Sequence, residues 1–276
     1  MPTFFHSLIG FSLLLGSVLL PSSSLTAQGP ISGFQSPAGE LVFAIAYGRE
    51  NYDTYLSPTG DEARELRGSN ASVFAEYGLN SRSALVVNVP YISNNENNKG
   101  LQDASVWFKY RNQRTQTQSG GYHNFFTAVG GSFPLGSYPV DDPLAIGQRA
   151  GVFSGRLVYQ YDAKSGWFIH GQSGIDFQFS PDSRAAWPVV IRSGFGAKHF
   201  YVEGWWESVR ALGDGGGGAP NQAVGTGSSW TRLGGTLYVP VVPRFGLFGS
   251  GAYVLSGKFI GQATRWNLGA VVKFGR

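Results

Sequence analysis

The chain has 276 residues, no cysteine and a formal net charge of +4. Only 14 % of its residues are charged, well below the roughly 25 % of soluble globular proteins. Gly, Phe, Tyr and Trp are abundant instead, with 40, 20, 13 and 7 residues. This composition excludes a disulfide-stabilised secreted domain, and the basic residues are too scattered to form a nucleic-acid-binding face. We therefore expect no nucleic-acid partner.

The N-terminus has the pattern of an export signal. An apolar run, LIGFSLLLGSVLL, occupies residues 8–20 and ends at Pro21 and a serine cluster. The small residues around Ala27 then form a cleavage site, and the run is too short to span a bilayer. Residues 1–7 lack Lys and Arg, which departs from the usual basic start, and a buried N-terminal helix is the alternative. We expect a signal peptide at 1–27, a short periplasmic segment at 28–39 and the main domain at 40–276.

Beyond residue 39, apolar and polar residues alternate along one segment after another. In GWFIHGQSGIDFQF, residues 166–179, large apolar residues share one parity, and His170, Gln172, Asp176 and Gln178 share the other. A period of two is typical of β-strands. In chain order, we expect twelve strands at 40–52, 70–79, 83–92, 101–111, 122–133, 152–162, 166–179, 187–197, 200–210, 230–240, 244–255 and 264–274.

The connections alternate in length. Long or Asn-, Asp-, Gly- and Pro-rich loops are expected near 53–69, 93–100, 134–149, 180–186, 211–229 and 256–262. The intervening turns are short, at 80–82, 163–165, 198–199 and 240–243, apart from a longer polar turn at 112–121. An up-and-down meander with long loops at one end, short turns at the other and an even number of strands is typical of bacterial outer-membrane barrels.

Alternation alone fits two architectures. A soluble barrel or sandwich buries its apolar face, whereas a membrane barrel turns that face to lipid. The expected strands run over about 10 to 14 residues, against ~5 to 6 in soluble proteins. Eleven residues at ~3.3 Å each, tilted by ~40°, rise by roughly 28 Å and match the hydrocarbon core. We therefore expect an all-β fold, a closed antiparallel up-and-down transmembrane β-barrel of twelve strands in the bacterial outer membrane.

This fold assigns a side to every residue of a strand. The aromatic residues expected to contact outer-membrane lipid are Phe108, Tyr110, Tyr159, Tyr161, Trp167, Phe177, Phe179, Trp266 and Phe274. The residues expected to line the lumen, as a candidate pore, are Glu76, Asp103, Lys109, Arg156, Gln160, His170, Gln172, Asp176, Gln178, Arg192, Glu203, Glu207, Arg232, Arg265, Asn267 and Lys273. Acids and bases are nearly balanced, so two interpretations stay open: a narrow channel, or salt bridges that fill the interior.

One strand resembles a known family. The sequence GLQDASVWFKYRN, starting at Gly100, resembles the "GLGD…KYR" strand of outer-membrane proteins named for the meta-pathway of phenol degradation. This resemblance implies a signal peptide, a barrel of about this length and a part in transport. The last strand is similar to the signal read by the barrel-assembly machinery, a partner that we therefore expect, although Gly275 and Arg276 follow the terminal aromatic residue, Phe274.

Catalysis has little support in the sequence. A lipase-type site needs a Ser within reach of a His and a third orienting group. His123 and His170 are the available histidines of the expected strands, and Ser105 and Ser173 are weak candidates for a nucleophile, with Ser173 on the lipid-facing parity. No metal-ligand spacing occurs in the sequence, and we expect no catalytic residue, cofactor or metal.

Three function classes follow from the sequence. The first is a small pore or transporter for small hydrophobic or aromatic compounds, which the family resemblance favours. The second is a structural or adhesive surface barrel that acts through its outer loops. The third is an outer-membrane lipid or peptide hydrolase, which the residues favour least.

The facing assignment makes a testable prediction at two adjacent residues. Gly171→Arg places a charge on the lipid-facing side of its strand and should weaken folding into the bilayer by ~2 to 4 kcal/mol near the midplane. Gln172→Arg, one residue along, points into the lumen and should be tolerated. Urea titrations of both variants in lipid vesicles measure the two free energies. Equal tolerance of Arg at 171 and 172 would contradict the assignment.

Overall fold

The computed structural model describes residues 31–94, 98–138, 147, 149–213 and 227–275, so the expected signal peptide at 1–27 lies outside the described residues. Within those ranges no helix is long and apolar enough to cross a membrane. The described residues form twelve long strands: β1 (Leu41–Leu56), β2 (Glu62–Gly78), β3 (Ser83–Ser93), β5 (Asp103–Gln116), β6 (Tyr122–Pro134), β7 (Gly151–Asp162), β8 (Trp167–Ser180), β9 (Arg184–Gly196), β10 (Tyr201–Leu212), β11 (Ser229–Val242), β12 (Phe245–Lys258) and β14 (Thr264–Phe274). Two short strands, β4 (Lys99–Leu101) and β13 (Ile260–Gly261), pair with β3 and β1.

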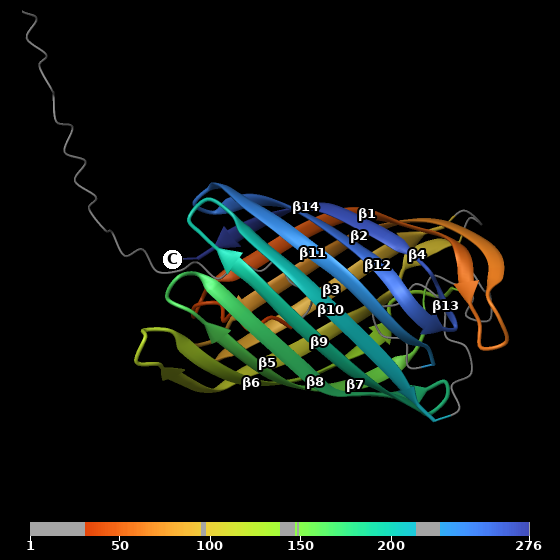
Figure 1. Ribbon diagram of the computed structural model, residues 1–276, viewed down its shortest axis with the longest axis horizontal. Coiled ribbons are helices and arrows are strands. Elements are labelled where there is room, and N and C mark those ends of the chain that lie inside the picture. The colour runs from red at the N-terminus through yellow and green to blue at the C-terminus, as the bar shows by residue number, and fades with distance from the viewer. Residues whose placement is uncertain (1–30, 95–97, 139–146, 148, 214–226, 276) are drawn as a thin grey trace, which may run out of the picture.

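The long strands close into a barrel. Each pairs antiparallel with the next long strand along the chain, and β1 pairs with β2 on one side and with β14 on the other (Figure 1). Leu41, at the start of β1, lies opposite Tyr77 of β2 and Phe274 of β14. Closure removes the free edges that an open sheet of this width would expose. The expected fold class, a closed antiparallel barrel of twelve strands, is confirmed.

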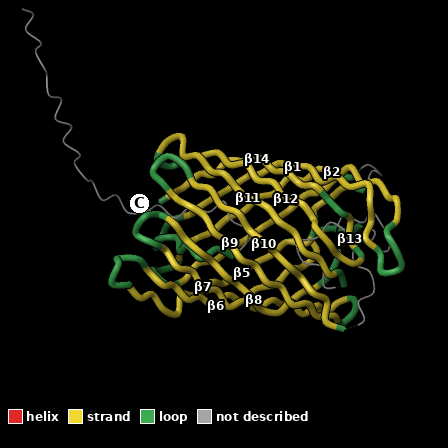
Figure 2. Tube along the Cα trace, in the orientation of Figure 1, coloured by secondary structure: helices red, strands yellow, loops and turns green. Residues whose placement is uncertain are grey.

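The connections lie at the two ends of the barrel, as Figure 2 shows. Here the "turn end" is the end with the short connections 79–82, 117–121, 163–166, 197–200 and 243–244, where β1 starts and β14 ends. The "loop end" is the opposite one, with connections 57–61, 94–102, 135–150, 181–183, 213–228 and 259–263. The polar segment that we expected as a turn, 112–121, is strand as far as Gln116.

The hairpin of β1 and β2 extends farther than expected. Residues 53–69 were expected to form a loop, yet β1 runs to Leu56 and β2 begins at Glu62, so the hairpin projects beyond its neighbours at the loop end (Figure 1). Arg67 pairs with Asp53 across this extension. The difference has a physical reason: Tyr55, Leu56 and Leu66 of the extension pack in a buried cluster, whereas its outer face is polar. Backbone hydrogen bonds and polar cross-strand pairs therefore maintain the hairpin without an apolar period of two.

The two faces of the wall differ sharply in polarity. Leu157 and Leu268 point outward with 70 % and 61 % of their surface exposed, whereas the inward-facing Lys109, Gln160 and His170 are 0 % exposed. This is the reverse of a soluble barrel and fits a wall in contact with lipid. Of the aromatic residues expected outside, Tyr159 and Tyr161 are half-buried on the outward-facing parity, and the exposed ones are Phe108, Tyr110, Trp167, Phe177, Phe179, Trp266 and Phe274.

Large rings in the lumen lie against glycines of the wall. A Cβ atom added to Gly234 would lie 2.1 Å from an edge carbon of the Trp205 indole, which occupies that space from the neighbouring strand. The same packing joins Gly130 to Trp107, where the distance would be 2.5 Å. A glycine without a side chain lets the ring approach the backbone, so an indole fits inside a barrel of this diameter.

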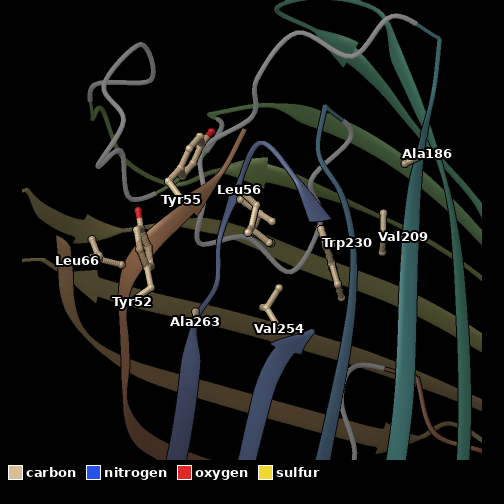
Figure 3. Close-up of a cluster of buried hydrophobic side chains, with 10 residues drawn as sticks. Tyr52, Tyr55, Leu56, Leu66, Ala186, Val209, Trp230, Val254 and Ala263 are labelled. Carbon is tan, nitrogen blue, oxygen red and sulfur yellow. The ribbon is translucent and has the colours of Figure 1, made fainter. Parts of the chain in front are cut away.

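Apolar side chains gather inside the barrel at both ends. At the loop end, Tyr52, Leu66 and Trp230 belong to one buried cluster, whose side chains come from strands on several parts of the wall (Figure 3). At the turn end, Phe168 and Tyr201 belong to another. The lumen is therefore partly filled, as expected for a barrel between the packed eight-stranded and the open sixteen-stranded sizes.

The contact between ring and glycine makes a prediction about stability. Gly234→Val drives a side chain into the Trp205 indole and the adjacent backbone, and should destabilise the barrel by about 1 to 3 kcal/mol, the usual cost of overpacking. The matched control is Gly155→Val on β7, where an added Cβ meets nothing within 4 Å. Urea-induced unfolding in vesicles or micelles gives both values. Equal effects of the two substitutions would refute the packing argument.

Candidate functional site

The lumen is the candidate functional site, because the barrel gathers its polar side chains there. The structure places the expected lumen residues in two groups. The buried ones are Glu76, Lys109, Arg156, Gln160, His170, Asp176, Gln178, Arg192, Glu203 and Lys273. The half-buried ones are Asp103, Gln172, Glu207, Arg232, Arg265 and Asn267.

The charges of the lumen are paired across neighbouring strands. Arg156 Nη2 donates to both oxygens of Asp176, at 2.8 and 2.9 Å, and Ser154 Oγ donates to Asp176 Oδ1 at 2.6 Å. On another part of the wall, Arg232 Nε donates to Glu207 Oε2 at 2.7 Å. In low dielectric, such a pair is favourable only when its remaining hydrogen-bonding groups are also satisfied. The Ser154 hydroxyl supplies one of these further hydrogen bonds to Asp176.

Two further pairs lie on other parts of the wall. Arg192 lies 3.7 Å from Glu203, whose other oxygen accepts a hydrogen bond of 2.9 Å from the Tyr201 hydroxyl. Arg265 pairs with Glu50, directly opposite on β1. Glu50 was missed as a lumen residue, although it has the same parity as the inward-facing residues at the start of its strand. Among the described residues, the lumen therefore carries paired charges of both signs and no ring of charges of one sign.

Two of these guanidinium groups stack on tryptophan. The Arg156 guanidinium lies 5.2 Å from the centre of the Trp107 ring, and that of Arg232 lies 4.5 Å from Trp230 and 5.4 Å from Trp205. Each guanidinium thus has an indole on one side and a carboxylate on another, a favourable cation–π arrangement. Among the described residues, the Nε1 atoms of Trp107 and Trp230 are buried without a hydrogen-bond partner. We call these two groupings the tryptophan–arginine stations.

The segment before β1 lies inside the barrel. We expected a short periplasmic segment at residues 28–39, and its described part, residues 31–39, bonds to the wall of the lumen at the turn end. Ser36 donates to Glu76 Oε1 through Oγ at 2.8 Å and through N at 3.3 Å. Lys109 Nζ donates to the Phe34 carbonyl at 2.6 Å and to Glu76 Oε1 at 3.1 Å.

Apolar contacts hold the same segment. The Phe34 ring packs edge-on against Phe168 and Tyr201, with centroids 5.4 and 6.2 Å apart, and Ile31 joins a buried cluster around Trp107. The Lys109 and Glu76 side chains are 0 % and 1 % exposed under this cover. The position of the segment could not be read from the sequence, because one stretch without a repeating pattern gives no face to assign. The segment narrows the lumen at the turn end.

At the loop end, the connection between β6 and β7 is fastened to the wall. The Tyr138 hydroxyl donates to Asp103 Oδ1 and accepts a hydrogen bond of 3.0 Å from the Arg149 backbone N–H. Tyr138 also packs against Ile92. Burial, and after it the neighbouring Asp103 carboxylate, raises the pKa of the Tyr138 phenol above its ordinary value. Asp103 thus positions a connection as well as facing the lumen.

The histidines occupy different faces of the wall. His170 is enclosed, with Nδ1 3.3 Å from Gln160 Oε1, whereas His123 Nδ1 lies 2.8 Å from the hydroxyl of Tyr159, a residue of the outer face. Ser173, on the outer face and three residues after His170, accepts a hydrogen bond from Trp187 Nε1 at 2.8 Å. In the parts of the chain that the structure covers, no group of three His, Cys, Asp or Glu residues is arranged to hold a metal ion.

Three solved structures share the fold. An outer membrane channel from Pseudomonas putida F1 has a TM-score of 0.68 at 14 % identity, over 87 % of this chain and 97 % of the channel. The NanC porin has a TM-score of 0.57 at 8 % identity, over 84 % of this chain and 100 % of the porin. The KdgM porin has a TM-score of 0.53 at 11 % identity, over 84 % of this chain and 99 % of the porin. At these identities the likeness is one of fold.

A family model covers most of the sequence, whereas no curated protein matches it. The model, described as "Putative MetA-pathway of phenol degradation", matches residues 20–253. This range includes the strand at Gly100 that resembled the family, so that prediction is confirmed. The protein therefore belongs to the family named for the MetA-pathway of phenol degradation.

Proposed function

We propose that the protein is a bacterial outer-membrane channel for small hydrophobic or aromatic compounds. The shared fold with an outer membrane channel and two porins supports a channel, and the family description supports aromatic solutes. In this proposal residues 1–27 are a signal peptide, the turn end faces the periplasm, and the barrel-assembly machinery reads β14.

The observation that carries the proposal is the pair of tryptophan–arginine stations. At each one an aromatic ring faces a guanidinium whose charge a carboxylate balances. Each station has no net charge, and its nearly buried indole has an N–H donor without a partner among the described residues. A small solute with an aromatic body and one hydrogen-bond acceptor matches this lining. A free ion matches it less well, because no ring of one sign attracts it.

The N-terminal segment determines the width of the path in this proposal. Residues 31–36 lie between Glu76 and Lys109 on one part of the wall and Phe168 and Tyr201 on another. A passing solute has to move beside this segment, so bulky solutes are excluded while small ones pass. The tightly bound Lys109 ammonium, with the Phe34 carbonyl and Glu76 as acceptors, keeps the segment in place.

The other function classes have less support. A hydrolase needs a histidine beside a nucleophile, but His170 is enclosed beside Gln160 and His123 belongs to the outer face. A structural or adhesive barrel would act through the connections of the loop end and would need no aromatic lining in the lumen. The stations therefore favour a channel over both.

Conduction tests the channel directly. In planar bilayers the purified protein should give discrete open-channel steps, and benzyl alcohol, a neutral aromatic solute, should interrupt the open current. Trp230→Ala removes the ring and N–H of one station and should weaken this block severalfold. Trp187→Ala, on the outer face where Trp187 is 46 % exposed, is the matched control and should leave the block unchanged. An electrically silent wild-type barrel would favour a structural or adhesive role instead.

The N-terminal segment provides a second test. Deleting residues 31–36 removes the groups that occupy the lumen at the turn end and should raise single-channel conductance severalfold. Phe34→Ala combined with Ser36→Ala should give a smaller increase, because the backbone contact to Lys109 remains. Pro37→Ala, at an exposed position next to the segment, serves as control. Unchanged conductance after the deletion would show that the segment does not limit the path.

A further inference from the structure

Cationic side chains ring the turn end of the barrel. Five of its short connections, with the strand ends beside them, contribute to this ring. We call these residues the turn-end cations: Arg82, Arg111, Arg114, Lys164, Lys198 and Arg244. All except the half-buried Arg111 are exposed.

Carboxylates do not balance this ring. On the turns, at the first or last residue of the strands beside them and just before β1, the described carboxylates are Glu40 and Asp162. Glu76 and Glu203 lie farther into the lumen, where they pair with Lys109 and Arg192. Asp162 accepts hydrogen bonds from Asn124 Nδ2 at 2.8 Å and Gln160 Nε2 at 2.7 Å, and one turn-end cation, Arg114, interacts with it electrostatically. Glu40 interacts electrostatically with the inward-facing Lys273. Within the described ranges, no ion pair includes a turn-end cation.

The loop end is different. There Arg64 pairs with Glu62 at 3.0 Å, and Arg184 pairs with Asp182 at 3.4 Å. Arg67 contacts two carboxylates of the β1–β2 hairpin. Several exposed cations of the loop end therefore have partners within the protein, while those of the turn end have none of this kind. A ring of unbalanced positive charge fits an anionic surface outside the chain.

The aromatic residues beside the ring indicate its depth. Trp167, Phe195 and Phe200 lie together at the turn end. The centroid of the Phe195 ring lies 5.3 Å from that of Trp167 and 5.9 Å from that of Phe200. The Arg114 guanidinium lies 4.0 Å from the centre of the Tyr122 ring. Aromatic girdles of membrane proteins lie at the level of the lipid headgroups. Cations next to such a girdle are within reach of lipid phosphates.

We propose that the turn-end cations bind the phosphate headgroups of anionic phospholipids, in the leaflet that meets the turn end. Long Arg and Lys side chains extend from the barrel end to the interface, and clusters of four to eight such residues are the usual signature of anionic-lipid binding. The exposed positions of Lys164, Lys198 and Arg244, on three separate turns, allow several lipids to bind around the rim. This site is separate from the lumen and does not depend on conduction.

Lipid selectivity tests the proposal on the folded, full-length barrel. The protein is reconstituted into phosphatidylcholine vesicles that contain brominated phosphatidylglycerol or brominated phosphatidylcholine, and quenching of tryptophan fluorescence gives the relative affinity for the two lipids. The wild type should prefer phosphatidylglycerol severalfold at low ionic strength, and added salt should reduce this preference, because exposed charges are screened. Heat-modifiable migration on a gel verifies that each variant is folded.

A pair of triple variants separates the two ends. K164Q/K198Q/R244Q should lose the preference for phosphatidylglycerol, whereas R64Q/R67Q/R184Q, which removes the same charge from the loop end, should keep it. A wild type that binds both lipids equally, or equal selectivity in the two triple variants, overturns the proposal. An acidic periplasmic protein would then be the partner to test on this surface. A barrel that is silent in bilayers but selective for phosphatidylglycerol would contradict the channel and leave the lipid site standing.

Discussion

The constraint on which the whole structure depends is the lack of water in the hydrocarbon core. Every backbone N–H and C=O group at that depth needs a partner within the protein, and a sheet meets this demand only when it closes on itself. The pairing of β1 with both β2 and β14 meets it here. Once the sheet is closed, alternate residues of each strand point outward and into the lumen. Large apolar groups such as Leu157 and Leu268 meet lipid, and the polar residues between them share a small interior.

That small interior explains the pairing of its charges. Isolated ions in low dielectric are costly, so each guanidinium of the lumen lies beside a carboxylate, as in Arg156–Asp176 and Arg232–Glu207. The same shortage of space explains why rings such as Trp205 lie against glycines of the wall. Part of the abundance of glycines and aromatic residues in the sequence thus has a common cause. A lumen that holds aromatic rings requires a wall with places where backbone is uncovered.

Each end of the barrel has its own contacts to a segment outside the long strands. At the turn end the segment before β1 returns into the lumen, where Lys109 and Glu76 bind its backbone and its serine. Around the same end, unpaired cations face outward beside an aromatic girdle. At the loop end Tyr138 fastens the connection between β6 and β7 to Asp103. The proposed path for a solute therefore runs from the loop end, past the two tryptophan–arginine stations, to the turn end, where residues 31–36 occupy part of the lumen.

The sequence by itself determined the barrel and its twelve strands, and along its regularly alternating segments it predicted which residues face outward. A period of two is a local property, and strands long enough to cross a bilayer repeat it many times, as residues 166–179 do. Only the tertiary structure decided which charges meet, because the pairing of Arg232 with Glu207 or of Arg265 with Glu50 depends on register and closure. It also decided the extension of the β1–β2 hairpin, whose polar outer face and irregularly spaced buried residues leave no apolar period of two to detect. The position of residues 31–36 was beyond the sequence for a third reason: their contacts to Glu76, Lys109 and Phe168 join parts of the chain that only the closed barrel brings together.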